Sequence, residues 1–153
     1  PGLGFLYNNC MNCFNPRLGY PNSIAPGKSR SSGITPTIVL KDGEPLIVIG
    51  APGGNRIIGA VAHGIINILD HRMTPVEAVY APRFDCQWFD TVDVSRRIPS
   101  YLCEALTKKG HKVVKSTFDY EPYALLQALY VDREHRRVLG GSDPRGGGVA
   151  LSE

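Results

Sequence analysis

Gly50-Ala51-Pro52-Gly53-Gly54-Asn55 is the stretch of sequence that decides how this chain folds. It follows an apolar, β-branched run at 45–49 and precedes a run of helical period that begins at Arg56. We therefore predict a strand-to-helix turn with two glycines at its tip, where a positive φ is tolerated. Unpaired amides at the start of a helix carry partial positive charge, so such a turn suits a carboxylate, a phosphate or a developing oxyanion. The alternative is a plain turn in which Asn55 caps the following helix.

Length and composition bound the class of protein. The 153 residues, 42% hydrophobic and 20% charged, suit one globular domain over residues 1–153. The net charge of +3 comes from scattered basic residues, so we expect no nucleic-acid partner. No apolar stretch reaches the roughly 20 residues of a membrane span. The chain begins at Pro1 without an initiator methionine, so we expect a processed or truncated product, and the compartment stays open.

The cysteines and histidines do not form a recognisable metal site. Cys10 and Cys13 have the spacing of a zinc ligand pair or a redox pair, but no second close pair accompanies them. The four histidines lack ligand spacing with them, so we expect no metal and no cofactor. At this cysteine density we expect no disulfide framework. His63, near the apolar face of the predicted helix, is expected to be a partnered or exposed side chain rather than a catalyst.

Hydrophobic periodicity and turn residues predict the remaining elements. Helices are expected over 56–71, 75–81 and 99–109, the second opened by a capping box at Thr74. Strands are expected over 34–40, 46–49, 91–94, 111–115, 124–132 and 136–139. Asp42-Gly43 predicts a hairpin between the first two strands, whose nearly continuous apolar residues predict burial on both faces. Residues 15–33 are expected as a loop, long enough to favour a functional surface, and the tail 140–148 is rich in glycine. This order indicates an α/β or α+β class.

Five stretches, in this order, resemble motifs of the γ-glutamyltranspeptidase family. Gly4-Phe5-Leu6-Tyr7-Asn8-Asn9-Cys10-Met11-Asn12-Cys13-Phe14 is similar to the family's G-x-L-L-N-N-x-M-x-x-F. Residues 36–43 resemble S-P-T-I-V-x-K-D-G, and residues 50–57 resemble G-S-P-G-G-S-R-I. Ala81-Pro82-Arg83-Phe84 and Ser142-Asp143-Pro144-Arg145 match two further motifs. The resemblance covers nearly the whole chain.

The resemblance implies an N-terminal nucleophile hydrolase. Such a protein is made as a precursor that cuts itself into a large and a small subunit. The new N-terminal Thr of the small subunit then attacks an amide carbonyl, with its own α-amine as the base. We therefore expect an α+β fold, a four-layer αββα sandwich shared by both subunits. This chain resembles most of a small subunit without its nucleophile segment, so its expected partner is the large subunit of the same precursor, and alone it should be inactive.

The resemblance also assigns site residues. Gly53 and Gly54 would supply the amides of the oxyanion hole. The substrate contacts would come from Asn9, Cys10, Cys13, Ser31, Ser32 and Gly33.

The chain departs from the family pattern where the substrate is held. Transpeptidases bind the glutamyl α-amine through a polar residue before Met and an Asp before Phe. At these positions this chain has Cys10 and Cys13. Thiols are weak hydrogen-bond acceptors and therefore poor partners for an ammonium group. The family's Ser-Ser pair for the α-carboxylate aligns with Ser32 and Gly33, with Ser31 one place early. The loop after Phe14 is also shorter than in transpeptidases that carry a lid.

These departures favour the acylase or amidase branch of the family. Its substrate would be a small amide whose acyl group bears a carboxylate and lacks an α-amine. Ser32 or Ser31 would hold that carboxylate. A true γ-glutamyltransferase or glutathione hydrolase is the first alternative, in which other residues, including some of the large subunit, restore the contact. A non-catalytic binding or structural remnant is the second.

Overall fold

The computed structural model describes residues 2–88, 90–117 and 123–151, and its contacts divide the chain into two compact units. The first unit is Pro1–Ser32 and the second is Gly33–Glu153. The first unit contains a 3-10 turn, η1 (Cys10–Cys13), and a single β-bridge between Asn15 and Ser23. Loop structure over most of 15–32 agrees with the prediction from its Pro, Gly, Ser and Asn content.

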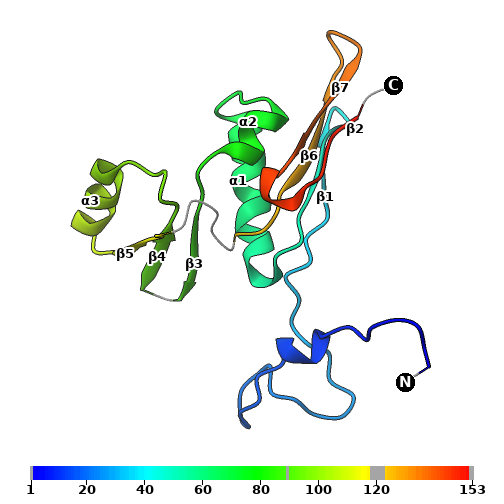
Figure 1. The fold of residues 1–153 in the computed structure, drawn as a ribbon, viewed down its shortest axis with the longest axis vertical. Coiled ribbons are helices and arrows are strands. Elements are labelled where there is room, and N and C mark those ends of the chain that lie inside the picture. The colour runs from blue at the N-terminus through cyan, green and yellow to red at the C-terminus, as the bar shows by residue number, and fades with distance from the viewer. Residues whose placement is uncertain (1, 89, 118–122, 152–153) are drawn as a thin grey trace. The chain divides into compact units, whose positions relative to one another are not determined.

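The second unit is built on a four-stranded antiparallel sheet in the order β1-β2-β6-β7 (Figure 1). Its strands are β1 (Thr37–Lys41), β2 (Glu44–Gly50), β6 (Gln127–Asp132) and β7 (Arg137–Ser142). The predicted hairpin is confirmed, with Asp42 and Gly43 both at positive φ between β1 and β2. Strand β7 continues past the predicted end at Leu139 into Gly140 and Gly141, because neither residue carries a side chain that would collide with its neighbours.

Two helices cover one face of this sheet (Figure 1). They are α1 (Ile57–Leu69) and α2 (Pro75–Tyr80). The predicted capping box is confirmed, because the Thr74 side chain accepts from the Glu77 amide and the Glu77 carboxylate accepts from the Thr74 amide. Ile47 and Ile49 of β2 are buried in one core with α1 residues such as Val61.

A smaller sheet follows α2, in the order β3-β4-β5. It contains β3 (Phe84–Trp88), β4 (Thr91–Val94) and β5 (Lys112–Lys115), with α3 (Ser100–Lys108) between the last two. β4 and β5 are parallel, whereas β3 and β4 are antiparallel. Strand β3 was not predicted, although Phe84–Trp88 alternates apolar and polar residues, because five residues give only a short pattern. Helices placed beside mainly antiparallel sheets confirm the α+β class.

The prediction that β1 and β2 are buried on both faces is wrong for this chain. Ile38 and Leu40 of β1 are 61% and 58% exposed, and Val48 of β2 is 39% exposed. They belong to the face of the four-stranded sheet opposite α1 and α2, which we call the uncovered face; its exposed apolar residues are Ile38, Leu40, Val48, Leu129 and Val138. Both strands are apolar on two faces, but only one face is covered within this chain.

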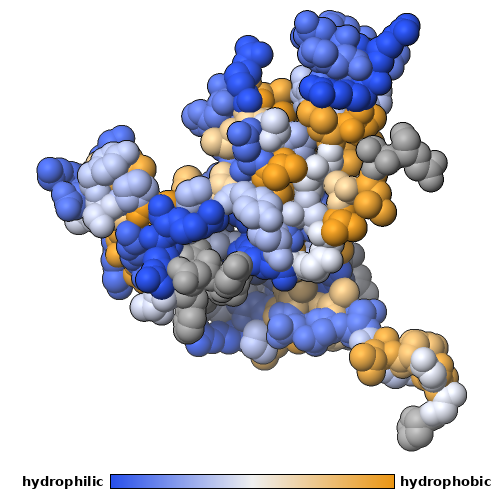
Figure 2. Space-filling model, turned by 45° about the horizontal axis from the view of Figure 1, so that its top comes forward, coloured by the Kyte–Doolittle hydropathy of each residue, from blue (hydrophilic) through white to orange (hydrophobic). Residues whose placement is uncertain are grey.

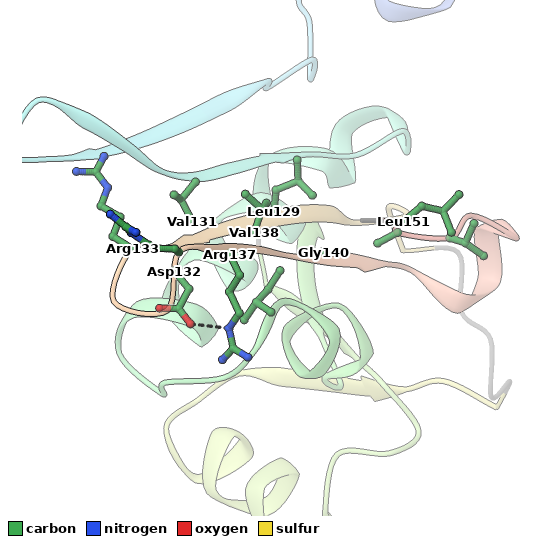
Figure 3. Close-up of a pocket in the computed structure, with 12 residues that line it drawn as sticks. Leu129, Val131, Asp132, Arg133, Arg137, Val138, Gly140 and Leu151 are labelled. Atoms are coloured by element: carbon green, nitrogen blue, oxygen red, sulfur yellow. Dashed lines mark hydrogen bonds and ion pairs between the residues drawn. The ribbon is translucent and has the colours of Figure 1, made fainter. Parts of the chain in front are cut away.

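The uncovered face continues into a hollow beside the β6–β7 hairpin. Leu129, Val131, Val138 and Leu151 line this space of about 1160 Å³, and an ion pair between Asp132 and Arg137 lies at one end (Figure 3). Figure 2 shows hydrophobic residues beside the hydrophilic tip of this hairpin, at the upper right. Gly50 pairs with Gln127 at the start of β6, whereas the hollow lies toward the other end of this strand, near Asp132.

Among the residues that the structure describes, no helix combines the length and the apolar composition needed to cross a membrane.

A strand glycine that touches α2 gives a test of the packing. A Cβ at Gly141 would lie 2.5 Å from the Pro75 carbonyl oxygen, whereas a Cβ at Gly50 would meet nothing within 4 Å. We expect Gly141→Ala to lower the free energy of unfolding by about 1–3 kcal/mol, because helix backbone cannot yield as a side chain can. Gly50→Ala should be neutral or slightly stabilising. Urea denaturation of the full-length protein measures both, and equal effects would contradict the proposed cause.

Candidate active site

The strand-to-helix turn predicted at residues 50–55 is present. β2 ends at Gly50, a 3-10 turn η2 (Gly54–Arg56) follows, and α1 begins at Ile57. Gly53 has φ 153° and Gly54 has φ 62°, a region that favours glycine. The alternative in which Asn55 caps the helix is wrong, because Asn55 lies inside η2, and Arg56, at the N-cap of α1, makes no side-chain capping bond.

The backbone amides of this turn are available to a ligand. Gly53 and Gly54 are both exposed. Within the described ranges, neither amide donates a hydrogen bond, whereas the Gly53 carbonyl accepts from Arg56 N at 3.3 Å. The two N–H groups lie at the start of a helix, where the dipole favours negative charge. Two exposed donors and a favourable local potential suit the turn to contact with a negatively charged group.

Close packing also requires glycine here. A Cβ at Gly53 would lie 2.5 Å from the Cα of Ala124, and a Cβ at Gly33 would lie 2.5 Å from the carbonyl oxygen of Gly54. On the Ala124 side, the Leu125 amide donates to the Pro52 carbonyl at 2.9 Å. The turn is thus held between two backbone segments that are distant in sequence, and Gly33 belongs beside it.

A buried ion cluster fixes the Ala124 side of this arrangement. Asp143 is fully buried, and its Oδ2 lies 2.5 Å from a guanidinium nitrogen of Arg83 and 2.5 Å from one of Arg145. Both guanidiniums also donate to the Ala124 carbonyl, at 3.1 and 3.2 Å. Two of the sequence motifs, 81–84 and 142–145, thereby meet on one backbone carbonyl next to the glycine turn.

The cluster shifts the titration of its members. Burial alone would raise the pKa of Asp143, but the hydrogen bonds from Arg145 and Arg83 outweigh it and hold that pKa at about 2. The pKa of Arg83 is lowered, first by burial and then by the positive charges of Arg145 and Arg97, against the opposing effect of Asp143. The carboxylate is therefore ionised at neutral pH.

His63 is partly buried on α1, with its ring 4.3 Å from the ring of Phe84. Burial and the charge of Arg83 lower its pKa, against the opposing effect of Asp85, so the imidazole is neutral near pH 7. The His63 ring is thus a partnered side chain that packs against an aromatic neighbour. Arg56 pairs with the buried Asp85 at 3.3 Å.

The first unit holds the remaining candidate residues. Cys10 and Cys13 lie at the two ends of η1 and are partly buried. The Asn22 amide joins Cys13 to Ser31, because its nitrogen donates to the Cys13 carbonyl at 2.6 Å and its oxygen accepts from Ser31 N at 3.1 Å. The Ser31 hydroxyl donates to the same carbonyl at 3.2 Å. Asn9 and Ser32 are exposed.

Two parts of this arrangement were not predicted. Asn22 gave no signal, because an Asn in a polar loop is ordinary. The Arg83–Asp143–Arg145 cluster had one possible signal, since the two motifs carry opposite charges that suit a buried pair. Ala124 gave none, because its role depends on a tertiary contact. In the described ranges, no three His, Cys, Asp or Glu side chains are grouped so as to hold a metal ion.

Removing the shared carboxylate tests the cluster. We expect Asp143→Asn to lower the free energy of unfolding by about 3–5 kcal/mol, because it leaves the buried Arg83 without its counter-charge. Asp132→Asn is the matched control: Asp132 also contacts two basic side chains and has a pKa of about 2, but these side chains, Arg137 and His135, are more than half exposed. Its effect should be much smaller. Denaturant unfolding of the full-length protein measures both.

The pH dependence has a defined sign. A depressed carboxyl pKa stabilises the fold above the unfolded value, near pH 4, and that contribution is lost as the pH falls toward about 2. The difference between wild type and Asp143→Asn should therefore shrink over this interval. A difference that stays constant would show that the charge of Asp143 is not the cause.

Comparisons with known proteins agree with this arrangement. The family model described as Gamma-glutamyltranspeptidase matches residues 1–152. The chain is 40% identical over 118 residues to the Acylase ACY 1 proenzyme of Pseudomonas sp. (strain SE83), covering 76% of the chain and 21% of the relative. It is 35% identical over 153 residues to the Glutathione hydrolase proenzyme of Escherichia coli (strain K12), covering 93% of the chain and 26% of the relative.

A solved structure shows the same fold. A mutant of Helicobacter pylori gamma-glutamyltranspeptidase superposes with a TM-score of 0.82 at 36% identity, over 94% of this chain and 83% of that one. The chain spans about a fifth to a quarter of the length of the curated relatives it matches. Motifs, fold and family model agree over nearly every residue, and the chain belongs to the gamma-glutamyltranspeptidase family.

Proposed function

We propose that this chain is most of the small subunit of an N-terminal nucleophile amide hydrolase. In this proposal residues 1–153 lack the segment that carries the Thr nucleophile. The observation that supports the hydrolytic site is the Gly53-Gly54 turn, whose two amides are exposed at the start of a helix without an acceptor in the described ranges. The proposed substrate is a small amide whose acyl group bears a carboxylate and no α-amine.

In the proposed mechanism the Thr hydroxyl attacks the amide carbonyl carbon while the Thr α-amine takes the hydroxyl proton. Negative charge then develops on the carbonyl oxygen, where the N–H groups of Gly53 and Gly54 donate to it. Collapse of the tetrahedral intermediate breaks the C–N bond, and the protonated α-amine returns its proton to the leaving amine. Water hydrolyses the acyl-enzyme by the same route, with the same turn stabilising the second oxyanion.

The uncovered face supports a large-subunit partner. Ile38, Val48 and Leu129 lie in register on neighbouring strands and remain exposed. Exposed apolar sheet faces of this kind are sites of association. In the proposed αββα sandwich a second sheet from the large subunit packs on this face, and α1 and α2 form the outer layer.

The charge of the first unit supports the acylase branch. Residues 1–32 contain no Asp or Glu, but they contain Arg17, Lys28 and Arg30. A substrate α-ammonium would need a carboxylate or several strong acceptors, and the Cys10 and Cys13 thiols supply neither. A substrate carboxylate, by contrast, would meet an excess of positive charge from this segment.

The hydrogen bonds around Asn22 bear on which serine holds that carboxylate. The Ser31 hydroxyl proton is directed to the Cys13 carbonyl, and its oxygen accepts from Asn22 at 3.0 Å. Ser31 therefore serves to fix the loop behind Cys13. We assign the carboxylate contact to Ser32 and to basic residues, with Gly33 keeping the backbone close to Gly54.

A direct comparison of two substrates tests the branch. We expect the full-length, processed protein to hydrolyse glutaryl p-nitroanilide with a higher kcat/KM than γ-glutamyl p-nitroanilide. Cys13→Asp should raise kcat/KM for the glutamyl substrate by about 10- to 100-fold, because a charge-assisted hydrogen bond contributes about 1.5–3 kcal/mol. Cys13→Asn is the neutral control of similar size and should leave that value nearly unchanged.

The alternatives give different results. Preference of the unmodified protein for the glutamyl substrate would favour the glutathione hydrolase reading, which the name of the Escherichia coli relative also supports. No turnover of either substrate, together with a single uncut chain by intact mass, would favour a non-catalytic remnant. Two chains by mass, the smaller beginning with Thr, establish that the protein tested has been processed.

Alanine substitutions at the two neighbouring glycines compare a Cβ that would collide with Ala124 with a Cβ that would meet no atom. Gly53→Ala should lower kcat by about 100-fold or more, because the new Cβ would collide with Ala124 and displace the amides. Gly54→Ala meets nothing within 4 Å and suffers only the strain of its positive φ, so we expect a smaller loss. Steady-state kinetics on the better substrate measure both. Equal kcat values for Gly53→Ala and wild type would remove this turn from the mechanism.

A further inference from the structure

A pocket of about 320 Å³ is lined by Tyr123 and by the Arg83–Asp143–Arg145 ion cluster. It lies between the end of α2, the segment after β4 and the Asp143–Arg145 motif, and we call it the arginine pocket because Arg83, Arg97 and Arg145 all line it. Its volume is at the lower end of the range for small-molecule sites.

Positive charge exceeds negative charge in this pocket. Asp143 is the acidic residue among its described lining residues, which also include three arginines. Both oxygens of Asp143 already accept hydrogen bonds from Arg83 or Arg145. Arg97 pairs with no carboxylate in the described part of the chain, and its charge contributes to the lowered pKa of Arg83. Counted over its described lining residues, the pocket has three guanidiniums and one carboxylate, a net charge of +2.

The walls of the pocket are held in place before any ligand binds. Tyr123 is 8% exposed, and its hydroxyl donates to the Asp93 carbonyl at 3.1 Å. Ser95 is 3% exposed, its amide donates to the Arg83 carbonyl at 2.9 Å, and its hydroxyl oxygen accepts from the Arg97 amide at 3.2 Å. These bonds fix the backbone that carries Arg97 beside the buried cluster, so little ordering is needed on binding.

We infer that the arginine pocket binds the anionic head group, carboxylate or phosphate, of a small molecule. The planar guanidinium of Arg97 can donate two parallel hydrogen bonds to such a group, and Arg145 at the opposite side adds charge. The inference goes beyond the proposed function, because binding here requires no nucleophile and no turnover. The site adjoins the turn through Ala124, whose carbonyl Arg83 and Arg145 hold.

Calorimetric titration of the full-length protein tests the inference. Inorganic phosphate and acetate are the two probes, each added up to about 10 mM at constant ionic strength set with chloride. We expect saturable binding of at least one probe, weakened about tenfold or more by Arg97→Gln. The matched control is Arg96→Gln, which removes the same charge from the adjacent residue; Arg96 does not line the pocket, so binding should change less than twofold. Binding of one probe alone identifies the head group.

Three outcomes would overturn the inference: no binding of either probe, binding that Arg97→Gln leaves unchanged, or equal weakening by the two variants. Circular dichroism establishes that each variant is folded. If Arg97→Gln does not fold, Arg97→Lys replaces it, and its phosphate affinity should fall below wild type because an ammonium cannot match the fork; unchanged affinity would again overturn the inference. Hydrolysis is not measured, so this result is independent of the proposed activity.

Discussion

The Asp143 carboxylate, placed between Arg83 and Arg145, is the interaction on which the candidate site depends. This carboxylate is fully buried and joins Asp143 to Arg83, 60 residues away in the sequence. Its negative charge must therefore be compensated within the cluster. The same two guanidiniums hold the Ala124 carbonyl, and the neighbouring Leu125 amide holds Pro52. A buried charge cluster thus sets the position of a backbone segment that abuts the glycine turn.

The turn itself satisfies two demands with the same residues. Gly53 allows the chain to approach Ala124, and the absence of side chains leaves the adjoining amides open. Packing alone would explain glycines here, so the glycines by themselves do not establish an oxyanion site. The proposed oxyanion role rests instead on the exposed amides at the start of the helix, which have no acceptor in the described ranges.

Electrostatics gives the two proposed sites a common feature. The first unit has basic residues and no carboxylate, and the arginine pocket has three guanidiniums for one carboxylate. Both are therefore suited to anionic ligands, whereas the net charge of the whole chain is only +3. Asp132, for example, lies outside both proposed sites, in the β6–β7 hairpin, where it pairs with the exposed Arg137. Local charge, not net charge, determines which ligand a site prefers.

The sequence by itself determined most of the secondary structure, the α+β class and the family. The hairpin at Asp42-Gly43, the capping box at Thr74 and the strand 91–94 depend on neighbours within a few residues, and such local signals are complete in the sequence. The glycine turn was predicted for the same reason. The tertiary structure alone decided that β1 is exposed on one face, that Gly141 belongs to a strand against α2, and that Asn22 joins Cys13 to Ser31. It also decided that Arg83, Asp143 and Arg145 meet on Ala124. Each of these depends on residues brought together from distant parts of the chain, and burial and ion pairing act on distance in space, which no local pattern contains.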